Sequence, residues 1–219
     1  MPRIARMELE SAMFAVLDVE TTGLSHEQGH RVCEVGAIKL RAGKEIERYH
    51  TLVHPAMAVP EEATRIHRIT DDMLKDAPPF ATIARPLREF LAGTVMIAQN
   101  ARFDLGFINA EFLRTGLGRL SIPVVDTVTL ARRVRPGLSG YSLDRLAHHF
   151  QIPVDSRHRA LGDCEVTVRV FLECLKTLRQ KGEVRSVEDL VKRGGVHNPE
   201  TAAVEAAGGR SNPSLPNVL

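Results

Sequence analysis

Four carboxylates and one histidine stand in short motifs that are spread along the chain: Asp18 and Glu20, then Asp104, then His158 and Asp163. Side chains two residues apart on a strand point to the same face, so Asp18 and Glu20 would project together from a strand. Such a pair repels itself, and burial raises the pKa of at least one member unless a cation compensates. Divalent ions that prefer oxygen ligands would compensate. The pattern therefore predicts a metal site and suggests metal-dependent nuclease chemistry.

Each of these residues also has a plainer interpretation. An Asp-x-Glu pair can be a solvated strand end, and Asp104 or Asp163 could simply complement the dipole of a helix N-terminus. His158 argues for a joint role, because its spacing of five from Asp163 would send the two side chains apart on one continuous helix. If a helix begins near Ala160, a loop carries His158 and both side chains can approach one spot.

The elements that must position these residues follow from the hydrophobic pattern. An apolar run at residues 14–19 predicts a strand buried on both faces. Strand formers at residues 31–40 and 45–53, separated by a turn at 41–44, predict a hairpin. Further strands are expected at residues 95–98 and 122–126, and short helices at 61–67, 71–74, 80–91, 101–113, 127–134 and 142–150. The fold class is α/β, with a mixed central sheet and helices on both faces.

Helix boundaries are predicted from capping residues. Thr70 is expected to cap the helix that begins at Asp71, and Asn100 the helix that carries Asp104 in its opening turn. Pro86 should break or kink the helix at residues 80–91. Beyond Ala160, apolar residues at intervals of three and four predict a long helix that packs on the sheet and ends near Gly182.

The length of 219 residues, 43% of them hydrophobic, fits one globular domain. We place that domain at residues 1–182 and a flexible tail at 183–219, where glycine and proline accumulate and only a short helix at 187–192 is possible. Lysine and arginine number 29 against 27 acidic residues, a net charge of +2. Because this balance gives no general attraction for a polyanion, any contact with nucleic acid must be local.

The cysteine content and the absence of long apolar runs bear on the cellular setting. The three cysteines are odd in number and form no CxxC motif, which favours a reduced environment. The first residues contain no apolar run of signal-peptide length, and no later run approaches the roughly 18 residues of a membrane span. We expect a soluble, cytoplasmic protein without membrane contact.

Taken together, the motifs resemble those of the DEDDh exonucleases, and within that family the proofreading (epsilon) subunits of bacterial DNA polymerase III are the most similar. The resemblance covers roughly residues 14–178, and the motifs that carry it are residues 14–24, 66–70, 100–104, 126–127, 141–143 and 158–163. Many members have a histidine where this chain has Gln99. The family implies an RNase H-like fold and 3′-to-5′ exonuclease activity.

The resemblance also implies a division of labour among the five residues. Two divalent cations about 4 Å apart would clamp the attacking and leaving oxygens of a phosphodiester, with Mg²⁺ the default ion and Mn²⁺ a substitute. Asp18 would bridge both ions. Glu20 and Asp163 would complete the site that holds the attacking water, and Asp104 would support the second ion through water. His158 would deprotonate the water.

The family places the 3′-terminal nucleotide against the turn that follows the first motif. The substrate-binding residues that the resemblance implies are Thr21, Thr22, Leu24, His67, Asn100 and Phe103. The threonines would hold the terminal 3′-OH, Leu24 would wedge beside the last base, and Phe103 would offer a stacking surface. Thr22 and Phe103 could equally be structural, and His67 could pack a helix junction. Arginines 132, 133, 135, 157 and 159 could meet phosphates, but charged residues on loops are usually only solvated.

The leading hypothesis is a 3′-to-5′ exonuclease that acts on single-stranded or frayed 3′ ends, DNA in preference to RNA, and releases nucleoside 5′-monophosphates. An exoribonuclease of the same family and a catalytically silent nucleic-acid-binding module are the alternatives. The complete carboxylate set argues against the silent module, since such a cluster is costly without metal. By analogy with polymerase-associated members, residues 183–219 could bind the alpha subunit of DNA polymerase III. The sequence leaves that role and the oligomeric state open.

Overall fold

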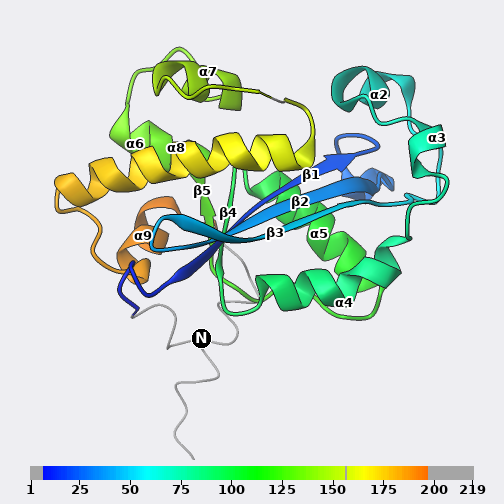
Figure 1. Ribbon diagram of the computed structural model, residues 1–219, viewed down its shortest axis with the longest axis horizontal. Coiled ribbons are helices and arrows are strands. Elements are labelled where there is room, and N and C mark those ends of the chain that lie inside the picture. The colour runs from blue at the N-terminus through cyan, green and yellow to red at the C-terminus, as the bar shows by residue number, and fades with distance from the viewer. Residues whose placement is uncertain (1–6, 156, 197–219) are drawn as a thin grey trace, which may run out of the picture.

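The computed structural model describes residues 7–155 and 157–196. A five-stranded sheet lies at its centre with the strand order β3-β2-β1-β4-β5 (Figure 1). The strands are β1 (Met13–Thr21), β2 (Val32–Arg41), β3 (Lys44–Leu52), β4 (Val95–Ala98) and β5 (Val124–Asp126). β1, β2 and β3 pair antiparallel, whereas β4 runs parallel to β1 and β5 parallel to β4. The predicted mixed sheet is confirmed.

β1 occupies the middle of the sheet because its side chains are apolar on both faces. Phe14 and Val16 enter one hydrophobic core, while Ala15 and Leu17 enter the other. β2 and β3 form the predicted hairpin, whose turn places Ala42 and Gly43 at φ 49° and 73°, as a two-residue turn between twisted strands requires. β4 pairs with β1 only at residues 14–16, so the last residues of β1, which include Asp18 and Glu20, extend beyond this pairing while they stay paired with β2.

Helices cover both faces of the sheet, as predicted. They are η1 (His26–Gln28), α2 (Glu61–His67), α3 (Asp71–Leu74), α4 (Phe80–Leu91), α5 (Arg102–Arg114), α6 (Thr127–Val134), α7 (Leu143–His149), α8 (Ala160–Gln180) and α9 (Val187–Gly194). α6 to α9 share one core and α4 and α5 share the other. Figure 1 shows α8 running along one face of the sheet with α4 on the opposite side.

The predictions about helices have different outcomes. α4 continues through Pro86 without the predicted break, because buried residues on both sides of the proline, including Ile83 and Leu87, hold the helix against the core; a kink at Pro86 stays a prediction. Asn100 does not cap α5: it has φ 59°, and its backbone N–H donates to Asp126 Oδ1 at 2.9 Å. A carboxylate from the neighbouring strand therefore organises the start of α5. Thr70 caps α3 as predicted, accepting a hydrogen bond from the Met73 N–H.

The predicted domain boundary at Gly182 is also wrong. Residues 183–196 belong to the packed body, with Val184, Val187 and Leu190 buried in the core that α8 shares. A capping box of Ser186 and Asp189 starts α9, and the Val196 N–H donates to the Val124 carbonyl at 2.9 Å. Of the predicted tail, residues 197–219 lie outside the described residues.

α8 lies unusually close to the sheet at its N-terminal end. A Cβ atom added to Gly36 of β2 would come within 2.5 Å of the Ala160 carbonyl carbon, so only glycine permits this approach. The Cys164 thiol donates to the Gly36 carbonyl at 3.2 Å and reinforces the contact. The first turn of α8 is thereby fixed beside the end of β1. In the described ranges, none of the helices is long and apolar enough to cross a membrane.

Candidate active site

Three of the predicted carboxylates come together where β1 ends and α8 begins. Asp18 and Glu20 project from the same face of β1, and Asp163 lies in the first turn of α8. One carboxylate oxygen from each lies within 4.8 Å of the others. Figure 1 shows the tip of β1 and the N-terminal end of α8 on the same side of the molecule. An all-oxygen donor set of this kind fits a hard divalent cation such as Mg²⁺ or Mn²⁺.

Asp104 lies beside this group without joining it. Its side chain is buried in the first turn of α5 and accepts a hydrogen bond from the Val19 N–H at 3.1 Å. Burial is the main cause that raises the pKa of Asp104 to about 8, and the charges of Asp126 and Asp163 add to it. The predicted role of Asp104 in support of a second ion stays a prediction.

The cluster is electrostatically unfavourable without a cation. Loss of solvent, followed by the neighbouring charges of Asp104, Asp163 and Glu20, raises the pKa of Asp18 well above its ordinary value. Loss of solvent, followed by the charges of Asp163, Glu34 and Asp104, raises the pKa of Glu20 to about 8. A bound cation would favour the ionised forms of these side chains and so offset the repulsion between them. This donor set is therefore suited to a metal ion.

The loop before α8 presents His158 beside this cluster. The residue is exposed and has φ 57°, a conformation that costs energy for any residue except glycine. Its backbone N–H donates to Asp163 Oδ1 at 3.2 Å. The imidazole forms no hydrogen bond with any residue that the structure describes, so it is available to a bound molecule. The prediction that a loop, not the helix, carries the histidine is confirmed.

Glu34 of β2 anchors this loop to the sheet. This role was not predicted from the sequence. The Glu34 carboxylate is buried in β2 and accepts hydrogen bonds from the Arg159 guanidinium, at 2.6 to 3.1 Å, and from the Ala160 N–H at 2.9 Å. His50 adds a contact at 2.8 Å. Burial alone would raise the pKa of Glu34, but these partners together hold it below its usual value. The sequence did contain one indication of this role: Glu34 is an acidic residue inside a largely apolar strand, where a charge without a partner is unfavourable.

Arg157 supplies positive charge to the site from the other side of His158. Its guanidinium donates to Asp163 and, at 2.5 Å, to Asp144 of α7. Arg157 and Arg159 are therefore both held by carboxylates, not simply solvated as the sequence interpretation favoured. They fix the loop on either side of the histidine.

The predicted substrate threonines are engaged within their own loop. The Thr21 hydroxyl donates to the Gly23 carbonyl at 2.7 Å, and the Thr22 hydroxyl accepts from the Arg31 N–H at 2.9 Å. Both side chains are buried. Arg31 also binds Glu111 of α5 through two bonds of 2.6 and 2.9 Å, which clamps the loop to the helix. The threonines thus shape the loop, and their contact with a 3′-OH stays a prediction.

The remaining predicted substrate residues differ in accessibility. Leu24 stands 85% exposed at the tip of the loop, and Phe103 is partly exposed, with its ring centroid 4.9 Å from that of Phe107. Asn100 is exposed and serves through its backbone. His67 is buried at the junction of α2 and α3, where its Nδ1 accepts from the Ile69 N–H at 3.0 Å. The structural interpretation of His67 is the one that this geometry supports.

Comparison with known proteins places this site in a family. The exonuclease family model (RNase_T) matches residues 15–171, which contain all five motif residues. The chain belongs to this exonuclease family. The matched range also includes Glu34 and the loop anchored by it.

Sequence relatives carry exonuclease and polymerase names. The chain is 36% identical to the 3′-5′ exonuclease DinG of Bacillus subtilis over 167 residues, which are 76% of this chain but 18% of that protein. It is 37% identical to a DNA polymerase III subunit epsilon-like protein of Rhodobacter capsulatus, over 82% of this chain and 26% of that protein. It is 40% identical to the DNA polymerase III subunit epsilon of Treponema pallidum, over 74% of this chain and 76% of that protein. The chain thus spans a minor part of the first two relatives and most of the third.

Solved structures support the fold. Exonuclease X in complex with 5′ overhanging duplex DNA matches with a TM-score of 0.64 and 25% identity, over 82% of this chain and 98% of that one. Exonuclease I matches with a TM-score of 0.69 and 19% identity, over 78% of this chain and 42% of that one. The predicted RNase H-like fold is confirmed.

The raised pKa of Glu20 predicts a pH-dependent penalty in the metal-free protein. Because the folded-state value of about 8 lies above the ordinary 4.5, its stabilising contribution is complete below about pH 4.5 and is lost as the pH rises through about 8. In EDTA, Glu20→Gln should therefore be more stable than the wild type at pH 8.5, by on the order of 2 kcal/mol, and this advantage should shrink towards pH 5. Urea unfolding across this pH range measures it.

Mn²⁺ provides the control for the pH experiment. Millimolar Mn²⁺ should raise the melting temperature of the wild type and raise that of Glu20→Gln much less. A stability difference that did not change with pH, together with equal responses to Mn²⁺, would contradict a buried carboxylate cluster that binds metal.

The buried position of Glu34 predicts a large effect of its removal. Glu34→Gln leaves the Arg159 guanidinium without its carboxylate partner and should cost roughly 2–4 kcal/mol of unfolding free energy. Glu45→Gln is the matched control, because it breaks an arginine pair on the exposed surface and should cost less than about 1 kcal/mol. Urea unfolding gives both values. Faster hydrogen exchange of the Ala160 amide in Glu34→Gln alone would locate the effect in the loop, and equal costs for the two variants would refute the anchoring role.

Proposed function

We propose that this protein is a metal-dependent 3′-to-5′ exonuclease that removes nucleoside 5′-monophosphates from the 3′ ends of DNA. The observation that carries the proposal is the convergence of Asp18, Glu20 and Asp163 within 4.8 Å, beside buried Asp104 and the loop of His158, in a chain of the exonuclease family. DNA is favoured over RNA because several of the similar proteins are named as subunits of DNA polymerase III or are solved in complex with DNA, although one solved neighbour recognises the stem-loop of histone mRNA.

The carboxylates would hold two divalent cations, Mg²⁺ by preference with Mn²⁺ as a substitute. Ions bound there stabilise the negative charge that develops on the phosphate during hydrolysis. Asp18 interacts with the charges of Glu20, Asp104 and Asp163 and would contribute to both ion sites. Glu20 and Asp163 would complete one, and Asp104 would support the other.

His158 would act as the general base. Histidine titrates closer to neutrality than any other side chain, so it can accept a proton from water at physiological pH. As the water oxygen bonds to phosphorus, its proton would pass to the imidazole and the bond from phosphorus to the 3′ oxygen of the preceding nucleotide would break. The loop that carries the ring is fixed on both sides by Arg157 and Arg159. The imidazole is therefore already oriented, and less conformational entropy is lost when substrate binds.

The 3′ end would lie on the loop that follows β1. Leu24 stands exposed at its tip and would pack against the terminal base, while Phe103 would offer its partly exposed ring to the neighbouring one. The clamp between Arg31 and Glu111 holds this loop in place before the substrate arrives. A single-stranded or frayed end suits such a site, because the terminal bases must separate to be held singly.

Substrate comparison tests the proposed activity. With Mg²⁺, the wild type should shorten end-labelled single-stranded DNA and a mismatched primer-template from the 3′ end faster than RNA, and Asp18→Ala should be inactive. His158→Ala should lose roughly 10²- to 10⁴-fold in rate, while His54→Ala, at an exposed loop histidine, should retain the wild-type rate. Digestion of RNA alone would establish the exoribonuclease alternative. If the wild type digested none of these substrates, the catalytically silent binding module would be the remaining hypothesis.

We further propose that a replicative polymerase is the partner, through residues 197–219. The 40% identity to a DNA polymerase III subunit epsilon supports this association. The chain shortened after Val196 keeps the packed α9 and should retain exonuclease activity while losing co-purification with the polymerase alpha subunit. If the full and shortened chains co-purified equally well with the alpha subunit, residues 197–219 would not be needed for the interaction. A cytoplasmic location accords with such a partner and stays a prediction.

A further inference from the structure

Arginines on α6, α7 and the connection between them lack acidic partners. None of Arg132, Arg133, Arg135 and Arg145 forms an ion pair within the described ranges. Elsewhere in the described part of the chain some basic residues are paired, as Arg48 is with both Glu45 and Glu165, and others are single unpaired charges, but here four arginines without a carboxylate partner lie on two neighbouring helices and the connection between them. The positive charge on α6 and α7 is therefore uncompensated.

Neutral groups hold three of these guanidinium groups in place. Arg132 stacks over the Tyr141 ring with 5.1 Å between the guanidinium carbon and the centroid. Arg135 donates to His149 Nε2 at 3.1 Å, and Arg145 donates to the Ser139 hydroxyl at 2.6 Å. We call Arg132, Arg135, Arg145, His148 and His149 the basic face. The charges of its three arginines are positioned by contacts that do not neutralise them, an arrangement suited to an anion.

Part of the basic face lines a hollow of about 400 Å³, whereas Arg132 and Arg135 are not among the residues that line it. Arg145, His148, His149 and residues 138–140 line it. Asp144 is the one carboxylate among the lining residues, and it already accepts a hydrogen bond from Arg157 at 2.5 Å. The hollow is therefore a depression with basic side chains on its rim and a volume in the range of small-molecule sites.

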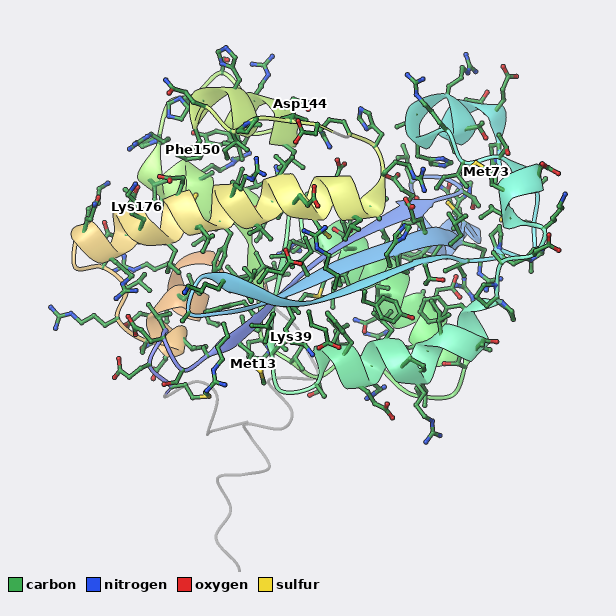
Figure 2. All side chains as sticks on the ribbon, in the orientation of Figure 1. Met13, Lys39, Met73, Asp144, Phe150 and Lys176 are labelled. Carbon is green, nitrogen blue, oxygen red and sulfur yellow. The ribbon has the colours of Figure 1, made fainter. Side chains whose placement is uncertain are left out.

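Direct contacts connect the hollow to the carboxylate cluster. Arg157 bridges Asp144, which lines the hollow, and Asp163, which belongs to the cluster. On the other side, the Gln99 side chain at the end of β4 donates to the Tyr141 carbonyl at 2.8 Å. Figure 2 shows Asp144 at the end of α7 nearer to the start of α8 and Phe150 at the opposite end. A strand with its 3′ end at the carboxylates can thus continue along α7.

We propose that the basic face binds backbone phosphates of the substrate strand on the 5′ side of the terminal nucleotide. This inference rests on the proposed exonuclease function. The chain has a net charge of only +2, and the carboxylates at the site repel phosphate, so attraction has to come from a local basic surface. Arginine suits phosphate because its planar group can donate two parallel hydrogen bonds. Continuity with the site favours nucleic acid over an acidic protein as the occupant.

A pair of matched triple variants tests the basic face. Arg132→Gln/Arg135→Gln/Arg145→Gln removes three charges from it. Arg41→Gln/Arg85→Gln/Arg119→Gln removes three charges from exposed arginines elsewhere that likewise have no carboxylate partner among the described residues. Binding of a fluorescent single strand of about twelve nucleotides is measured by anisotropy in EDTA over a range of salt concentrations, and urea unfolding confirms that both variants are folded.

The basic-face variant should bind the strand at least 10-fold more weakly near 0.15 M salt, and the slope of log K against log salt should fall by about 2, for three phosphate contacts at roughly 0.7 each. The control should change little. With Mg²⁺, hydrolysis of a dinucleotide, which reaches only the cleavage site, should stay at the wild-type rate in both variants, while hydrolysis of the longer strand should slow in the basic-face variant alone.

Equal binding by the two variants would overturn the proposal, as would an equal loss on the dinucleotide, which would place the effect at the cleavage site. Unchanged DNA affinity together with lost capture of the polymerase would assign the surface to an acidic protein instead. If the wild type hydrolysed neither substrate, the exonuclease function would fail, while the salt dependence of binding would still decide the role of the basic face.

Discussion

Repulsion among four carboxylates at the end of β1 is the constraint on which the rest of the structure depends. Asp18 and Glu20 share a face of the strand, and Asp104 and Asp163 approach from two helices. The pKa of Asp104 and of Glu20 is about 8, so gathering their charges opposes folding near neutral pH. Burial of apolar side chains on both faces of β1 provides the opposing free energy. The most central strand therefore carries the least favourable charges.

The surroundings reduce this cost in two ways. Asp104 and Asp163 each lie in the first turn of a helix, so the positive ends of the α5 and α8 dipoles face the cluster. Arg157 adds a full positive charge next to Asp163. The close approach of α8 to the sheet at Gly36 is what brings its N-terminus into range. Neither compensation removes the raised pKa of Asp18, which leaves a site whose stability and chemistry both call for cations.

The sequence predicted the parts of this site that depend on local pattern. Apolar runs placed β1, and the motif spacing placed His158 on a loop before α8. It did not predict Glu34, because its partner Arg159 lies 125 residues away and nothing local indicates the pairing. The start of α5 was mispredicted for the same reason, since Asp126 of another strand replaces a local cap. α9 was assigned to the tail because its short apolar stripe gains stability only against β5 and α6.

Arginine shows most clearly why such pairing decides function. Arg157 and Arg159 flank the histidine, and Arg132 and Arg135 follow β5. From the sequence alone, all four are equally plausible phosphate contacts. In the fold, carboxylates neutralise the first two, which become parts of the scaffold that orients His158. The other two contact only aromatic rings, an imidazole and main-chain carbonyls in the described structure, so their charge reaches solvent. A protein whose active centre repels a polyanion needs attraction elsewhere on its surface, and arginines without carboxylate partners on neighbouring helices would supply it without weakening the metal ligands.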